Sequence, residues 1–127
     1  MEKELVICDT NIFIHFLNND QKTIDKLLEI GLNNIAMSAI RAMELMQGMG
    51  NKSELKKMQK TIAQYNVIDF TSEVSELAVK QIENYSLSHN LQIPDSIIGA
   101  TAIIFDLPLF TYNTKDFKFM KDIRLFS

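Results

Sequence analysis

The chain has 127 residues and a formal net charge of −3 at pH 7, and 46% of its residues are hydrophobic and 23% charged. These values match ordinary globular proteins and exclude disordered, collagenous and coiled-coil classes. The length favours a single domain over residues 1–127, and the mildly acidic charge excludes a protein that grips duplex nucleic acid over its whole surface.

The first half of the chain alternates apolar runs with segments of helical periodicity. Residues 5–8 are wholly apolar, which is typical of a strand buried on both faces, and Asp9-Thr10-Asn11 then favour a turn or a helix cap. The same reading continues to Gly48 and Gly50, which mark the end of a helix. We expect strands at residues 5–8 and 35–37, helices at residues 12–17, 24–30 and 39–46, and helix caps at Asp20 and Ser38.

The second half repeats this alternation. Pro94 suits the first turn of a helix, and residues 88–92 are typical of a loop. We expect helices at residues 55–65, 74–85 and 94–105, strands at residues 67–70, 109–111 and 123–126, and caps at Asn51 and Thr71-Ser72. Strands separated by helices predict an α/β fold, a three-layer α/β/α sandwich around a mainly parallel central sheet.

The single cysteine and the apolar stretches bear on the compartment. Cys8 has no partner for a disulfide within the chain, so we expect a buried, unreactive thiol in a reducing compartment. The polar start, residues 1–4, does not resemble a secretion signal. The most apolar stretch, residues 97–105, is far shorter than the roughly 20 residues that cross a bilayer. These features predict a cytoplasmic protein without a membrane segment.

Acidic residues follow the predicted strands. In open parallel sheets the active crevice lies beyond the carboxyl ends of the strands. Asp9 directly follows the first strand, Asp95 lies in the first turn of a helix, and Asp116 follows the fourth strand. Each alone also suits a cap or a turn. Three carboxylates at one edge are harder to explain as accidents.

Glu44 is the residue that best separates an ordinary amphipathic helix from one that contributes to a carboxylate site. It lies about 40° from Ile40 around the helix, at the border of the buried face, although a Glu facing solvent would also fit. Four converging carboxylates repel each other, and a hard divalent cation with oxygen ligands relieves that repulsion. The pattern therefore predicts a Mg²⁺ or Mn²⁺ site, with Asp9 and Asp95 as the first ligands and Glu44 or Asp9 acting partly through a water.

Four segments in order carry a resemblance to a known family. They are ICDTNIFIHFL, MSAIRAMELMQG, IPDSIIGATAI and LPLFTYNTKDF. Together they resemble the PIN-domain ribonucleases, and among these the VapC toxins of toxin–antitoxin systems. The resemblance implies an acidic site of Asp9, Glu44, Asp95 and Asp116, with Asp9, Asp95 and Asp116 as metal ligands. Two residues depart from the pattern: Tyr112 stands where many relatives carry Arg or Lys, and Arg41 lies three residues before Glu44.

The resemblance also implies a function and partners. A PIN ribonuclease of this kind cleaves single-stranded regions of RNA with Mg²⁺ or Mn²⁺ and is silenced by a bound antitoxin protein. The segment at residues 12–17 is apolar almost all round, so we expect association with a second copy, as a homodimer, or with the antitoxin.

Supporting residues flank the acids. Thr10, Asn11 and Asn113 can orient carboxylates or waters, although all three suit ordinary turns. A short basic rim near the metal, formed by Lys115, Lys118 and Lys121, is suited to holding the RNA phosphate backbone.

Three other functions fit part of the pattern. A receiver-like Mg²⁺-binding signalling domain needs an early acidic pair, and a haloacid-type phosphatase needs Asp-x-Asp, whereas this chain has Asp9-Thr10-Asn11. The third alternative is a PIN fold retained for RNA or protein binding without cleavage. Retention of all four acids favours the nuclease.

Overall fold

The structure is a computed structural model that describes residues 4–127, so the first three residues of the polar start lie outside it. Its central sheet has the strand order β3-β2-β1-β4, and all three strand pairs are parallel. The strands are β1 (Val6–Cys8), β2 (Ile35–Ser38), β3 (Asn66–Ile68) and β4 (Leu109–Phe110). In the register of the sheet, Ile7 of β1 lies between Ala36 of β2 and Leu109 of β4.

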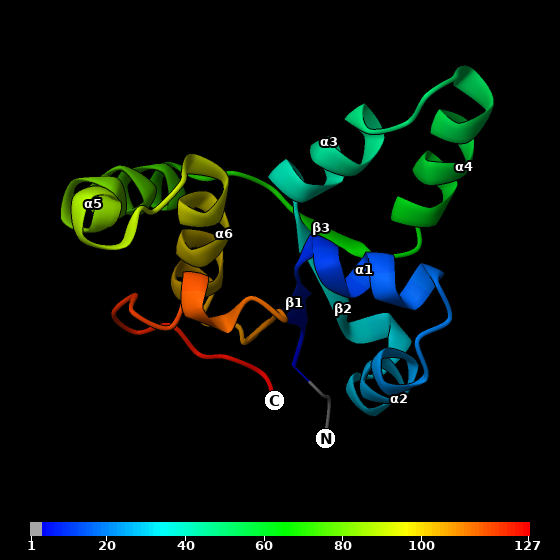
Figure 1. Ribbon diagram of the computed structural model, residues 1–127, viewed down its shortest axis with the longest axis horizontal. Coiled ribbons are helices and arrows are strands. Elements are labelled where there is room, and N and C mark those ends of the chain that lie inside the picture. The colour runs from blue at the N-terminus through cyan, green and yellow to red at the C-terminus, as the bar shows by residue number, and fades with distance from the viewer. Residues whose placement is uncertain (1–3) are drawn as a thin grey trace.

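Within residues 4–127, six α-helices cover the two faces of the sheet, as the alternation predicts. In Figure 1, α1, α2 and α4 lie on one side of the strands, and α5 and α6 lie on the other. The helices are α1 (Thr10–Leu17), α2 (Gln21–Ile30), α3 (Ala39–Gln47), α4 (Lys52–Ile62), α5 (Ser72–His89) and α6 (Ile93–Ile104). The predicted α/β/α sandwich is therefore confirmed, and its sheet is parallel throughout. No helix within residues 4–127 has both the length and the apolar character needed to cross a bilayer.

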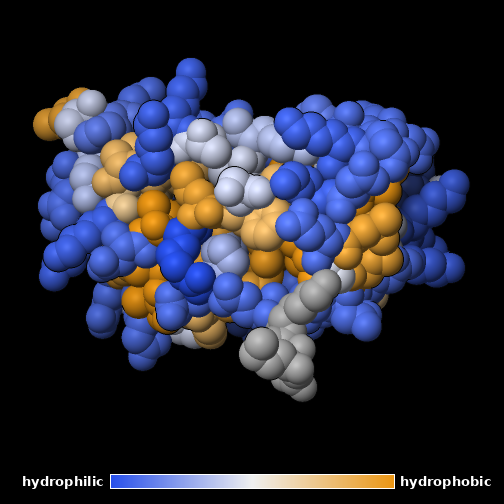
Figure 2. All heavy atoms as spheres, turned by 90° about the horizontal axis from the view of Figure 1, so that it is seen from below, coloured by the Kyte–Doolittle hydropathy of each residue, from blue (hydrophilic) through white to orange (hydrophobic). Residues whose placement is uncertain are grey.

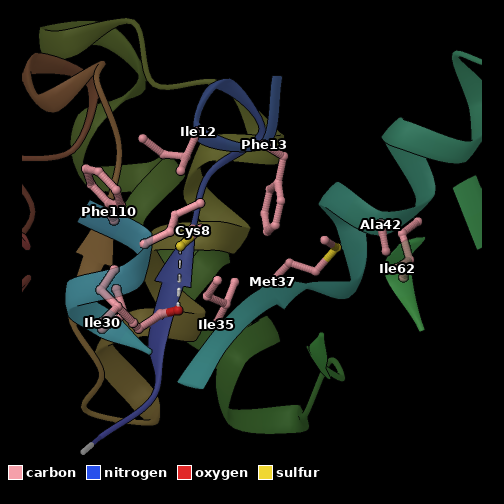
Figure 3. Close-up of a cluster of buried hydrophobic side chains, with 11 residues drawn as sticks. Cys8, Ile12, Phe13, Ile30, Ile35, Met37, Ala42, Ile62 and Phe110 are labelled. Atoms are coloured by element: carbon pink, nitrogen blue, oxygen red, sulfur yellow. Dashed lines mark hydrogen bonds between the residues drawn. The ribbon is translucent and has the colours of Figure 1, made fainter. Parts of the chain in front are cut away.

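Alternate residues of each strand supply two hydrophobic cores. Val6 and Cys8 point into a cluster with α1, α2 and α4, shown in Figure 3, while Ile7 between them packs with α6 on the opposite face. Leu109 and Phe110 of β4 divide between the two cores in the same way. Because successive strand side chains point to opposite faces, a strand covered by helices on both sides must be apolar throughout.

Cys8 lies inside the first core, as expected. Its side chain is fully buried, and its thiol points to the carbonyl oxygen of Val6 at 3.9 Å. Burial, together with the negative charge of Asp9, raises the pKa of the thiol to about 12. The thiol therefore stays protonated at neutral pH and is a poor nucleophile.

The predicted helix caps are present. At the start of each capped helix, a side-chain oxygen accepts a hydrogen bond from a backbone N–H of the first turn, which satisfies a donor that the helix itself leaves unpaired. These oxygens belong to Asp20, Ser38, Asn51 and Thr71.

The structure corrects several expected elements. The helix expected at residues 55–65 ends at Ile62, and the strand expected at residues 67–70 ends at Ile68. Residues 123–126 do not form a strand but make one isolated parallel bridge, between Leu109 and Leu125, in which the Leu109 N–H donates to the Arg124 carbonyl and the Phe126 N–H donates to the Leu109 carbonyl. The Ile123 N–H bonds instead to the carbonyl of Met120 in the preceding turn. Helix α5 continues to His89, into the expected loop, and ends at Asn90 with φ 53°. Asn tolerates this left-handed conformation, which is a common helix terminator.

Gly99 lets the segment after Asp116 pack closely against α6. A Cβ atom at Gly99 would overlap the Sδ atom of Met120 and lie 2.9 Å from its Cε atom. Met120 is 2% exposed, so it has little room to move aside. The missing side chain of Gly99 thus fixes how residues 117–120 lie on the helix that carries Asp95.

We predict that Gly99→Ala lowers the free energy of unfolding by about 1–3 kcal/mol, because it overpacks the core at Met120. Urea or thermal unfolding measures the change. The control is Gly48→Ala, where φ is −74° and a Cβ atom meets its nearest neighbour at an ordinary 3.5 Å. The control should be neutral or stabilising by up to about 1 kcal/mol. Equal effects of the two substitutions would contradict the close-packing argument.

Candidate active site

Asp9 is a buried carboxylate at the carboxyl end of β1, with only 2% of its surface exposed. Its Oδ1 atom accepts a hydrogen bond from the Thr10 N–H at 2.9 Å, and its Oδ2 atom accepts one from the Thr111 hydroxyl at 3.0 Å. Asp9 is therefore a helix cap, as its position alone suggests, and it is also tied to the residue that follows β4. A buried charge requires such partners, because an unpaired carboxylate would be costly.

Arg41 lies at the centre of the acidic residues. Its Nε atom donates to Asp9 Oδ1 at 2.7 Å, Nη1 donates to Glu44 Oε1 at 2.7 Å, and Nη2 donates to Asp95 Oδ1 at 2.8 Å. The Arg41 side chain is 12% exposed. Three of the four predicted acids thus meet around one guanidinium, although they come from the end of β1, from α3 and from α6.

Asp95 is held where the first turn of α6 meets α5. The neighbouring Ser96 is buried, and the side chain of Gln81 on α5 donates to its carbonyl at 2.8 Å and to its hydroxyl oxygen at 3.1 Å. Burial raises the pKa of the Asp95 carboxyl, and the charges of Asp9 and Asp116 add to this rise, while Arg41 opposes it. The raised pKa of Asp95 therefore reflects its burial first and the neighbouring acids only second.

Glu44 and Asp116 lie at the more open side of the cluster. The Glu44 side chain is 39% exposed and reaches the cluster through Arg41. Asp116 is exposed and closes the short 3₁₀ turn Thr114–Asp116. Its charge acts on Asp95, but it does not share the Arg41 guanidinium with the other three acids. The expected convergence thus holds tightly for three acids, and the fourth lies close enough to interact electrostatically.

The residues expected to support the acids act mainly through Thr111. The Asn11 side chain donates to the Thr111 hydroxyl oxygen at 3.3 Å, and that hydroxyl donates to Asp9. Asn113 joins through its backbone N–H, which donates to the same oxygen at 3.1 Å. Thr10 contributes its backbone N–H, while its own hydroxyl oxygen is buried without a hydrogen-bond partner among the described residues.

Tyr112 and the lysines lie outside the carboxylate cluster. The Tyr112 hydroxyl lies 2.5 Å from that of Thr23, and its ring contacts the ring of His15 edge-on, so this side chain connects β4 to α1 and α2. The three lysines of the expected basic rim are all exposed and flank Asp116 in sequence: Lys115, Lys118 and Lys121.

Sequence reasoning gives no role in the site to two residues of the cluster, Arg41 and Thr111. The interpretation of the four acids contained no role for Arg41 as their shared partner, although its spacing of three residues before Glu44 places both on one side of a helix. The pattern predicts Thr111 as part of the fourth strand, whereas it directly follows β4 at the same sheet edge as Asp9.

A comparison with models of protein families shows which family the chain belongs to. The model of the PIN domain matches residues 6–122, which is nearly the whole sequence. The chain belongs to the PIN-domain family. PIN domains are generally nucleases and typically use divalent metals. No curated protein sequence matches the chain.

Solved structures agree with this PIN-domain assignment. The chain is 30% identical to a chain of a toxin–antitoxin complex from Klebsiella pneumoniae, with a TM-score of 0.75 over 93% of this chain and 94% of that one. It is 24% identical to a chain of VapBC2 from Rickettsia felis bound to a promoter DNA fragment, with a TM-score of 0.78 over 96% and 97%. FitAcB from Neisseria gonorrhoeae gives 23% identity and a TM-score of 0.78 over 97% of each chain. The latter two share the fold.

The donor set of this PIN domain fits a hard divalent cation. The clustered carboxylate oxygens are the ligands that Mg²⁺ and Mn²⁺ prefer. A cationic group, the Arg41 guanidinium, already lies between Asp9 and Asp95. Within residues 4–127, no three Asp, Glu, His or Cys side chains are arranged to hold a metal in this structure. The carboxylates have the chemistry to bind a cation, and in this structure Asp9 and Asp95 bind the Arg41 guanidinium.

We predict that Asp95→Asn leaves the fold unchanged or slightly more stable at pH 7, by about 1 kcal/mol or less. The unfolded chain loses the Asp95 proton near pH 4, whereas the folded chain, with its raised pKa, loses it at higher pH. Stability therefore falls as the pH rises through this interval, and the loss persists at neutral pH.

At pH 7 the substitution removes this loss of stability. At pH 3 the Asp95 carboxyl is protonated in both the folded and the unfolded states, so there is no such loss and the substitution should have no effect of this kind. Urea unfolding of both proteins at the two pH values measures the difference. A marked destabilisation by Asp95→Asn at pH 7 would contradict the direction of the shift.

Proposed function

We propose that this PIN domain is a metal-dependent endoribonuclease that cleaves single-stranded regions of RNA, and that it is the toxin of a toxin–antitoxin pair. The observation that carries the proposal is the meeting of Asp9, Glu44 and Asp95 around one cationic group at the carboxyl edge of the sheet. The family supports the nuclease activity, and the similarity to a toxin–antitoxin complex supports the toxin role.

Each acidic residue has a role in this proposal. Asp9, Asp95 and Asp116 would hold Mg²⁺ or Mn²⁺, with Glu44 acting through a water. A bound divalent cation supplies two effects, a lower pKa of an attacking water and neutralisation of charge on the phosphodiester. Asn11 and Thr111 keep the Asp9 carboxylate oriented through their hydrogen bonds. The protein would hold the carboxylate oxygens of these acids in fixed orientations.

The exposed lysines near Asp116 suit the substrate. Lys115, Lys118 and Lys121 present positive charge beside the turn that carries this acid. Phosphate contacts of this kind give binding without sequence readout, and they weaken as salt increases. The rim would therefore hold the RNA backbone while the acids act on one phosphodiester.

The proposal extends to partners and compartment. We propose a protein antitoxin and a second copy of this chain as partners, and the cytoplasm as the compartment, in which the buried Cys8 stays reduced. On α1, Ile12 and Phe13 are buried, whereas Ile14 and Leu17 are 48% and 51% exposed. Figure 2, seen from below Figure 1, also shows apolar surface interrupted by hydrophilic side chains. Exposed apolar area of this kind favours association.

We predict that the purified chain cuts single-stranded RNA with Mg²⁺ or Mn²⁺ and loses this activity in a chelator. Asp95→Asn should reduce cleavage at least about 100-fold, because it removes a charged ligand. Gel analysis of a labelled RNA with an unstructured region measures the products.

The matched control is Asp106→Asn, the same chemical change at an exposed residue paired with Arg124. Asp106 has φ 52°, a conformation that Asn adopts well. The control should cleave at the wild-type rate. Cleavage that persisted in Asp95→Asn, or in a chelator, would point to a contaminating nuclease and remove support for a metal site. RNA binding without cleavage would favour the binding-only alternative.

We predict that the chain alone forms an assembly larger than a monomer at micromolar concentration. Sedimentation velocity measures its mass. Leu17→Asp, which places a charge on the exposed apolar part of α1, should shift the protein towards monomer, while Lys22→Asp on the neighbouring α2 serves as the control. A wild-type monomer that also fails to bind an antitoxin would argue against association through α1.

A further inference from the structure

Arg41 uses three different nitrogen atoms to bind three different carboxylates. All three hydrogen bonds are 2.7–2.8 Å long, the length of charge-assisted bonds, and the side chain is 12% exposed. The carboxylates of Asp9 and Glu44 outweigh the effect of burial and raise the pKa of Arg41 above its ordinary value. The guanidinium is therefore permanently charged and acts as the internal counter-ion of the cluster.

The oxygens that Arg41 occupies are those that a divalent cation would need. Asp9 Oδ1 already accepts from the Thr10 N–H and from Arg41, which uses both of its lone pairs. Asp95 Oδ1 accepts from Nη2. A guanidinium has no lone pair with which to bind a metal, and it repels a second cation at short range. Arg41 and a metal therefore compete for the same carboxylates.

The three hydrogen bonds of Arg41 differ in how readily each can remain when the guanidinium moves. Asp9 and Asp95 lie on other elements, whereas Glu44 follows Arg41 by one helical turn on α3 and is 39% exposed. Residues at this spacing have Cβ atoms about 5–6 Å apart on the helix surface, so their side chains can meet in more than one rotamer. Arg41 can therefore leave Asp9 and Asp95 while it stays paired with Glu44 at the open side of the cluster.

We infer that Arg41 is a positioning residue that holds the carboxylates of Asp9, Glu44 and Asp95 together when no metal is bound, and that a divalent cation binds by displacing its guanidinium from Asp9 and Asp95. This inference rests on the proposed function, because it concerns the same metal site. Two consequences follow. Arg41 weakens metal binding, because the metal must first displace the guanidinium. In the absence of metal, Arg41 stabilises the fold by neutralising part of the carboxylate charge.

Calorimetric titration with Mn²⁺ alone tests the competition. Arg41→Gln keeps hydrogen-bonding capacity but removes the charge, and it should bind Mn²⁺ about tenfold more tightly than wild type, a difference of about 1.4 kcal/mol. Arg41→Lys keeps the charge but cannot bond three carboxylates at once, so its affinity should be intermediate.

The chain offers a matched control in Arg124. This arginine also binds two acids, Glu4 and Asp106, but it is exposed and lies apart from the cluster. Arg124→Gln should leave the Mn²⁺ affinity unchanged. Equal or weaker Mn²⁺ binding by folded Arg41→Gln would overturn the inference.

Thermal unfolding gives a readout independent of catalysis. Metal-free Arg41→Gln should melt at a lower temperature than wild type. Mn²⁺ should raise its melting temperature more than that of wild type, because at equal concentration a ligand that binds the folded state more tightly stabilises it more. If metal-free Arg41→Gln does not fold, the wild-type protein still decides the question. Its Arg41 Nε–H NMR signal should shift on titration with Mg²⁺. A signal that stays unchanged while calorimetry shows saturation would overturn the displacement.

The results separate this inference from the proposed function. Equal Mn²⁺ affinity of wild type and Arg41→Gln refutes the competition but leaves the metal-dependent nuclease standing. Absence of Mn²⁺ binding in both proteins removes the metal site and the inference together. Binding by Arg41→Gln alone supports the competition in its strongest form.

Discussion

The burial of one carboxylate, that of Asp9, is the constraint on which the arrangement of the site depends. A charge that is 2% exposed must be matched by donors, and the donors come from three separate places: the Thr10 N–H, the Thr111 hydroxyl and the Arg41 guanidinium. Satisfying Asp9 therefore fixes the ends of β1 and β4 relative to the start of α3. Arg41, once drawn to Asp9, collects Glu44 and Asp95 with its remaining nitrogens.

Apolar packing determines whether Asp95 can reach this network. Helix α6 carries it, and α6 is placed by the core beneath the sheet, by the buried bonds from Gln81 to Ser96 and by the close approach of Met120 to Gly99. The same Met120 contact orders the segment that follows Asp116. The packing of the core therefore also sets the geometry of the site, because a small displacement of α6 would change the distances between Asp95 and the other carboxylates.

Much of the fold could be predicted from local pattern, whereas the site could be predicted only in part. The wholly apolar residues 5–8 and the caps at Ser38 and Thr71 are local signals, so the order of strands and helices followed from them. The positions of the acids at one sheet edge followed from topology. The hydrogen bonds of Arg41 to three elements depend on rotamers and on distances between segments up to 54 residues apart, which no local pattern encodes. Residues 123–126 pair with the sheet only at Leu109, and a local pattern does not show over how many residues two segments will pair.

The buried thiol of Cys8 gives this protein a built-in probe of its own motions. Cys8 is the only cysteine in the chain, it lies one residue before Asp9, and its high pKa and full burial keep it from reacting while β1 stays in the sheet. A thiol reagent can then label the protein only when β1 becomes exposed. The labelling rate therefore reports how often the strand that carries Asp9 opens, without an engineered label. Mass spectrometry of the labelled chain would measure local opening at the site itself.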